Sequence, residues 1–98
     1  MASMVSIQEQ PLTINNVNIF PNPISSDQAI SILLDNEVQG NVNISIHAVN
    51  GQLMHQSTLY KVSPEYKHEL TLESFTPGVY TVRIENNDRV GVQKLIVQ

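Results

Sequence analysis

The side chains that could support catalysis or bind a metal are few in this chain and widely spaced. Histidine occurs only at positions 47, 55 and 68, and cysteine is absent. A metal centre needs several ligands at short spacing, and covalent catalysis needs a serine or a thiol beside a base. No serine stands in a nucleophile-elbow sequence, and no glycine-rich phosphate loop occurs. We therefore expect no catalytic residue, no metal site and no cofactor.

The composition argues against nucleic-acid binding and against a membrane span. The formal net charge is −4, and the five lysines and arginines are scattered along the 98 residues. Binding of a nucleic acid depends on clustered cations that neutralise phosphates. No apolar run approaches the ~18 residues of a membrane-spanning helix, and no signal peptide is recognisable. The length fits one domain.

Apolar and polar residues alternate with a period of two, and no segment of a dozen residues keeps a helical pattern. Only 5% of the residues are aromatic, so the core must consist mainly of Ile, Val and Leu. β-branched residues favour strands. We expect a seven-stranded antiparallel β-sandwich of the immunoglobulin-like type. The expected strands span residues 14–20, 29–34, 42–49, 52–59, 66–72, 79–85 and 89–97.

Asn50-Gly51 is the strongest turn signal, because a type I′ turn needs positive φ at both central residues. It predicts a hairpin in which a two-residue turn places His55 on the core face and His47 on the opposite face. Either a bulge shifts the register so that Met54 faces inward, or His55 lies near the rim of the sheet. We favour the bulge. The residues expected in the core on alternation are Val42, Ile44, Ile46, Ala48, Tyr80, Val82, Ile84, Leu95 and Val97.

Two prolines bracket one asparagine after the first expected strand. Pro21 and Pro23 fix φ and donate no backbone hydrogen bond, so no sheet ladder can continue through this segment. The first strand must therefore end at Phe20.

Four separated motifs follow one another along the sequence. They are "IFPNP" at 19–23, "GNVNISIHAVNGQLM" at 40–54, "LTLESFTPGVYTVRI" at 70–84 and "KLIVQ" at 94–98. In this order and spacing, residues 14–98 resemble the C-terminal sorting domain of the type IX (Por) secretion system. Two departures are small: Gln52 stands where the family has a basic residue, and "FTPG" replaces Leu-Pro-x-Gly.

The resemblance implies a non-catalytic secretion signal. Members follow exported enzymes, adhesins and carbohydrate-active proteins of Bacteroidota, which enter the periplasm by a separate signal peptide. The implied partners are the N-terminal cargo domain, the outer-membrane translocon, its shuttle component and a sortase-like protease, and the destination is the cell surface or the medium. That protease commonly cuts the linker ahead of the first strand. We therefore expect residues 1–13 to be this linker, made of a non-native N-terminal extension and the end of an upstream segment. Residues 14–98 are then the domain.

On this resemblance, the final hairpin contains the signal that the translocon recognises. "PNP" ends the first strand, and "GVY" and "KLIVQ" form the last two strands. An exposed strand edge would bind a partner through main-chain hydrogen bonds. The residues expected in recognition are Pro21, Asn22, Pro23, Gly78, Tyr80, Lys94, Leu95, Ile96 and Val97.

Two further readings of the sequence stay open. An immunoglobulin- or fibronectin-like accessory module, which binds carbohydrate or acts as a spacer, would have similar strands. Carbohydrate platforms usually expose stacked aromatic side chains, and this chain has three Tyr, two Phe and no Trp. An open sheet edge could also join two copies of the chain in an edge-strand dimer.

Overall fold

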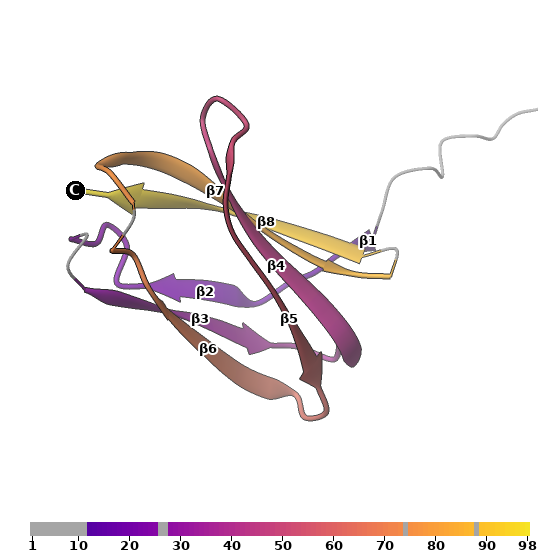
Figure 1. Cartoon of the computed structure of the whole chain (residues 1–98). Helices are drawn as coiled ribbons and strands as arrows, with labels where there is room; N and C mark the ends of the chain where they lie inside the picture. Colours follow the sequence, from indigo (N-terminus) through magenta and orange to yellow (C-terminus); the bar gives the residue numbers. More distant parts are fainter. Residues whose placement is uncertain (1–11, 26–27, 74, 88) are drawn as a thin grey trace, which may run out of the picture.

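Two β-sheets face each other in this computed structural model, which describes residues 12–25, 28–73, 75–87 and 89–98 (Figure 1). The strands are β1 (Leu12–Thr13), β2 (Val17–Phe20), β3 (Ala29–Asp35), β4 (Gly40–Ala48), β5 (Leu53–Lys61), β6 (Glu65–Thr71), β7 (Gly78–Asn86) and β8 (Arg89–Val97). One sheet has the order β1-β8-β7-β4-β5, and the other has the order β2-β3-β6. Neighbouring strands are antiparallel, except that β1 is parallel to β8. The described residues contain no helix.

This architecture confirms the seven expected antiparallel strands and the β-sandwich. The first of them is shorter than the predicted range 14–20, because β2 begins at Val17 and β1 belongs to the other sheet. Asn16 has a φ of 55°, which interrupts the extended backbone between the two. Ile14 and Val17 are both buried, at a spacing that a single strand would send to opposite faces. The end of this strand at Phe20 is confirmed.

The β4–β5 hairpin is closed by a three-residue loop, so the predicted two-residue type I′ turn is wrong. The backbone N–H of Ala48 donates to the carbonyl of Gln52 at 2.9 Å, and that of Gly51 donates to the carbonyl of Ala48 at 2.9 Å. Gly51 has a φ of 89°, whereas Asn50 does not have a positive φ. Only the glycine therefore takes the left-handed conformation, as in three-residue hairpin loops. Asn50 acts through its side chain, whose Oδ1 accepts from the Gln52 N–H at 3.0 Å.

The expected bulge in this hairpin is present. Ile46 lies opposite His55 and His47 lies opposite Leu53, so the register shifts between Ile46 and His47. The extra residue, Met54, packs against the core. His55 stays on the inner side and is half-buried, because it lies opposite an inward-facing residue on an edge strand. His47 faces the other way, as expected.

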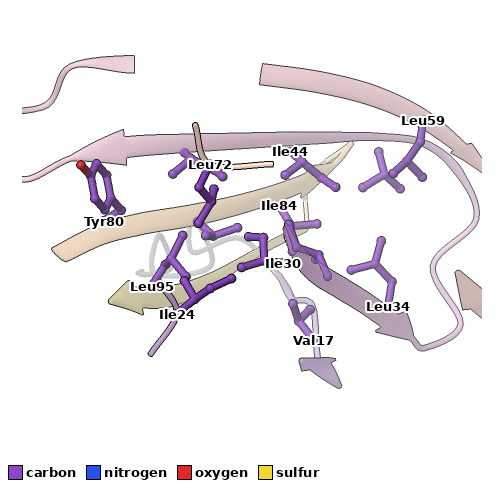
Figure 2. Close-up of a cluster of buried hydrophobic side chains, with 14 of the residues drawn as sticks. Val17, Ile24, Ile30, Leu34, Ile44, Leu59, Leu72, Tyr80, Ile84 and Leu95 are labelled. Carbon is purple, nitrogen blue, oxygen red and sulfur yellow. The ribbon is translucent and has the colours of Figure 1, made fainter. Parts of the chain in front are cut away.

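Aliphatic side chains from both sheets fill the core (Figure 2). Every residue expected there is buried except Ala48, which is half-buried and packs against the core. The opposite sheet contributes mainly Ile30, Ile32 and Leu34 of β3, all with no exposed surface. Burying a side chain of this size stabilises the fold by about 1.5–3 kcal/mol. The inward residues of β3, β4 and β7 therefore provide a large share of the stabilisation.

Lys61 is a fully buried cation at the end of β5, with no exposed surface. Its Nζ donates to four backbone carbonyls, those of Asn36 at 2.8 Å, Val38 at 3.1 Å, Ser63 at 2.8 Å and Pro64 at 2.7 Å. Burial lowers the pKa of this lysine, and the nearby charge of Asp35 raises it. The ammonium thus joins the β3–β4 loop to the β5–β6 loop and closes one end of the sandwich.

Candidate recognition site on the C-terminal hairpin

β7 and β8 carry two of the four sequence motifs, and their antiparallel register brings the motifs together. The paired residues are Gly78 with Val97, Val79 with Ile96, and Tyr80 with Leu95. Successive side chains of a strand point to opposite faces. Leu95 and Val97 are therefore buried in the core, whereas Lys94 and Ile96 lie on the outer face of the sheet.

The side chain of Asn22 pairs with the backbone of β8 as a neighbouring strand would. Its Nδ2 donates to the carbonyl of Lys94 at 2.8 Å, and its Oδ1 accepts from the N–H of Ile96 at 3.0 Å. A side-chain amide can replace a peptide group here because it presents a donor and an acceptor together. Figure 1 shows the segment after β2 beside the C-terminal end of β8. The asparagine between the two prolines thus attaches the end of β2 to β8.

Other segments cover more of the same edge of β8. Near the start of the strand, β1 pairs with it, and the N–H of Ile14 donates to the carbonyl of Val90 at 2.8 Å. Near its end, the N–H of Ile24 donates to the carbonyl of Ile96 at 2.9 Å, and the N–H of Gln98 donates to the carbonyl of Ile24 at 2.8 Å. The last strand therefore does not present a free edge at its two ends, because N-terminal residues of the domain occupy hydrogen-bonding groups of Val90, Lys94 and Ile96.

The part of the hairpin open to solvent is its outer face. Val79, Val92 and Ile96 expose 43%, 54% and 36% of their surface, although all three are large apolar residues. Val92, Lys94 and Ile96 share one side of β8, and Val79 lies opposite Ile96 on β7. We call these four residues the outer hairpin face. Adjacent exposed apolar side chains are typical of a surface that contacts another molecule.

Tyr80 fixes the loop that leads into β7. Its hydroxyl donates to the carbonyl of Thr76, and its ring centroid lies 4.9 Å from that of Phe75 at an interplanar angle of 59°. Both rings are buried. Pro77 and Gly78 lie between these contacts in the chain, so the tyrosine holds the turn against the core.

The structure brings the nine expected recognition residues into one region but not onto one surface. Three of them are buried, namely Tyr80, Leu95 and Val97. Six are exposed, namely Pro21, Asn22, Pro23, Gly78, Lys94 and Ile96. Only the exposed residues can contact a partner without unfolding, and the buried ones position them. Val79 and Val92 were not among the residues predicted from the sequence, although period-two alternation places them on the face opposite to that of the buried Tyr80 and Leu95.

A separate polar cluster lies on the inner side of β5 and β6. The Ser57 hydroxyl is 3.3 Å from Nε2 of His55 and 3.3 Å from Nε2 of His68, and the two ring centroids are 6.3 Å apart. Burial lowers the pKa of His68, and the charge of His55 lowers it further. The described residues hold no group of three or more side chains suited to a metal. A serine hydroxyl can donate to one ring nitrogen and accept from another, so the three side chains form a hydrogen-bonded cluster.

We expect the domain to lose stability when the pH falls below the ordinary histidine pKa of 6.5. The pKa of His68 is lower in the folded than in the unfolded state, so the unfolded state binds the proton more readily. The contribution to stability is complete above that pH and is lost as the pH falls toward the folded value. Urea denaturation of the parent chain and of His68→Gln between about pH 7.5 and about pH 5 measures this. Equal pH dependence of the two proteins would contradict the prediction.

Comparison with known proteins identifies the family of the domain. The family model described as "secretion system C-terminal sorting domain" matches residues 18–98, which is most of the chain. The chain belongs to this sorting-domain family. The family provides the C-terminal sorting signal of type IX secretion and is non-catalytic, and it implies export to the cell surface or the extracellular space.

The sorting domain shares its fold with a protein of distant sequence. No curated protein sequence matches it significantly. The 1.4 Å crystal structure of an uncharacterized protein from Bacillus anthracis str. Ames matches with a TM-score of 0.54 and 12% identity, over 93% of the sorting domain and 87% of that chain. At this identity, the likeness shows the fold alone. Among the described residues, no helix is long and apolar enough to cross a membrane.

Proposed function

We propose that the domain acts as a folded signal which takes an N-terminal cargo from the periplasm across the outer membrane. The outer hairpin face, together with the exposed segment Pro21–Pro23, is the surface that the translocon or its shuttle component binds. The domain itself performs no chemistry on the cargo.

The division of β8 into two faces is the observation that carries this proposal. Leu95 and Val97 are required by the core, because both are buried. Lys94 and Ile96 belong to the same motif, yet they point outward. An exposed lysine normally changes stability by no more than about 0.5 kcal/mol. A lysine at this place in the family motif therefore supports a role in binding a partner rather than in folding.

The proposed cut by a sortase-like protease lies before Leu12. Leu12 and Thr13 pair with Arg89 and Val90 in the sheet, so a cut after Thr13 would remove a strand from the sorting domain. This moves the expected domain boundary from 14 to 12. Residues 1–11, which make up the rest of the expected linker, lie outside the described residues.

A reporter fusion tests the sorting function. A periplasm-directed reporter joined to residues 12–98 is expected to reach the surface or the medium of a bacterium that has the type IX system. The same fusion in a strain that lacks the translocon is the control, and there the reporter should stay in the periplasm. A fusion that is folded and intact but remains periplasmic in both strains would contradict the proposed function.

A further inference from the structure

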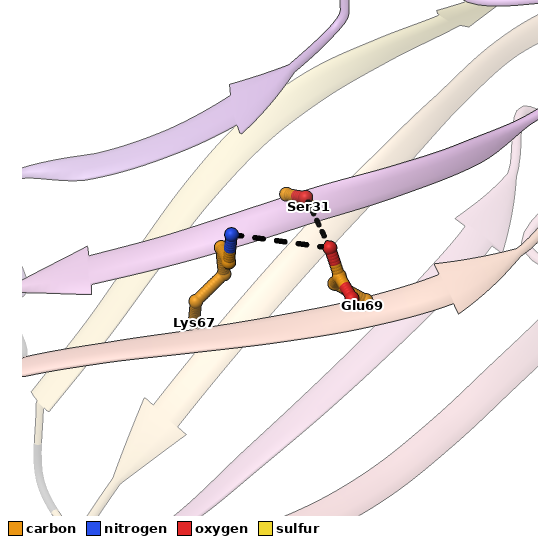
Figure 3. A network of polar contacts seen from close by, with 3 residues as sticks. All are labelled: Ser31, Lys67 and Glu69. Atoms are coloured by element: carbon orange, nitrogen blue, oxygen red, sulfur yellow. Dashed lines mark hydrogen bonds and ion pairs between the residues drawn. The ribbon is translucent and has the colours of Figure 1, made fainter.

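Three of the four outer sheet edges are protected against pairing. The edge of β8 is covered near both ends, and β2 is a strand of four residues followed by Pro21. On β6, Glu65, Lys67 and Glu69 are exposed on the outer face. The Glu69 carboxylate lies 4.0 Å from Lys67 Nζ and accepts from the Ser31 hydroxyl at 3.3 Å (Figure 3). Covered edges, short strands, prolines and charges all prevent pairing with another chain.

The fourth edge, β5, is the least protected within the described residues, because its bulge at Met54 and its inward Lys61 lie near the two ends of the strand and leave the segment between them open. It is nine residues long, and its outward side chains are uncharged. Leu53 and Tyr60 expose 48% and 65% of their surface. Lys61, the one charged residue of the strand, points inward and is buried. A long uncharged edge is a template for another strand.

The β4–β5 register identifies the backbone groups that face this edge. Ala48 donates its N–H across the hairpin, so every second residue before it on β4 directs its backbone groups to β5. The partners of those residues on β5 are the inward-facing ones, such as Ser57 opposite Ile44. The N–H and C=O groups of Gln56, Thr58 and Tyr60 consequently point to the free edge.

We infer that β5 pairs antiparallel with β5 of a second copy of the chain, about a two-fold axis at Ser57. In this register Gln56 of each copy lies opposite Thr58 of the other, and each such pair exchanges two backbone hydrogen bonds. The bulge at Met54 lies at the end of the paired segment, opposite Tyr60 of the second copy. The two five-stranded sheets then form one continuous sheet.

Self-complementarity favours a second copy over a different protein as the occupant. The strand supplies matching donors and acceptors to itself about the axis, and the outer side chains that meet there are Gln56 and Thr58. No like charges oppose each other along this edge, although the chain carries a formal charge of −4. Opposed like charges would destabilise the pair. The inference is independent of the sorting function.

A charge at the free edge tests the pairing. Sedimentation equilibrium of the 98-residue chain is expected to show a concentration-dependent dimer of the 10.9 kDa protomer. Gln56→Lys places two lysines close to the axis and should raise the dissociation constant at least about tenfold. Gln93→Lys adds the same charge on β8, at the opposite end of the sheet, and should leave the constant unchanged. Both variants should keep the parent melting temperature, because both side chains are exposed.

A cysteine on the axis tests the register. The sequence has no cysteine, and a Cys at 57 would face its copy in a non-hydrogen-bonded pair, with Cα atoms about 4.5 Å apart, within disulfide range. Mild oxidation should cross-link Ser57→Cys rapidly and Gln93→Cys slowly. Equal cross-linking of the two variants would overturn the inference. A parent chain that stays monomeric at millimolar concentration would also overturn the inference. The β5 edge would then be available to an extended segment of a different protein.

Discussion

Leu95→Ala is expected to lower the free energy of unfolding by about 3 kcal/mol and to abolish export. Leu95 has no exposed surface, so the substitution leaves a cavity between the sheets beside Tyr80, its partner on β7. A domain of this size has a total stability of only about 5–10 kcal/mol. Lys94→Ala, one residue away on the outer face, is expected to reduce export while changing stability by no more than about 0.5 kcal/mol.

Thermal melts of the two purified variants and secretion of reporters fused to them separate folding from recognition. The backbone carbonyl of Lys94, which accepts from Asn22, is retained in the alanine variant, so that contact is not lost. Full export of the Lys94 variant would remove this lysine from the recognition surface. Unchanged stability of the Leu95 variant would contradict the packing of β8 against the core.

Lys61→Met is expected to destabilise the domain by about 3 kcal/mol. The substitution keeps an unbranched apolar stem out to Cε but removes the ammonium group that donates to four backbone carbonyls in the two loops at this end of the sandwich. Leaving buried acceptors without a donor costs more than the removed hydrogen bonds contribute. The pKa lowering by burial shows that enclosing this ammonium is itself unfavourable, and the carbonyls offset that cost.

Lys67→Met on β6 is the matched control, because the Lys67 side chain is 54% exposed and a single ion pair at 4.0 Å links it to Glu69. Its stability should stay within about 0.5 kcal/mol of the parent. Urea denaturation of both variants measures the difference. Equal stability of the two variants would contradict the prediction. It would mean that the two loops do not require the hydrogen bonds donated by Lys61.

The alternation of apolar and polar residues made most of the fold predictable from the sequence. Strands buried on one face repeat apolar residues with a period of two, which is why β3, β4, β7 and β8 could be located from the sequence. Their inward residues, from Ile30 on β3 to Val97 on β8, are buried as that pattern requires. A bulge in the β4–β5 hairpin was also predictable, although the observed one leaves His55 opposite Ile46 on the inner side instead of replacing it there by Met54.

The remaining features depend on contacts between distant segments. Asn16 has a polar side chain within an alternating run, and nothing local indicates that its backbone leaves the strand conformation. Lys61 falls at an inward position, but a lysine at a strand end is usually exposed, and two of the four carbonyls that enclose it come from the β3–β4 loop, 25 and 23 residues away in sequence. The pairing of His55 with His68 through Ser57 likewise requires the relative position of two sheets.

The motifs predicted where the candidate site lies, but not how it is organised. The sequence motifs placed Asn22 in the same candidate site as the hairpin without a structural reason. The structure supplies that reason, because the side-chain amide of Asn22 hydrogen-bonds to the backbone of β8. The same contact covers the edge that the sequence analysis expected to be free. On the proposed function, a partner would therefore bind the outer side chains of this strand rather than its backbone.

The contact between Asn22 and β8 joins residues that are 72 and 74 positions apart. Contacts across such separations slow folding, because the intervening chain must be ordered before they form. A polypeptide that stops short of β8 lacks the neighbour of β7, the partners of Asn22 and three members of the outer hairpin face. The domain can therefore fold only after translation has continued through β8. A cargo whose synthesis stops earlier lacks a folded sorting signal.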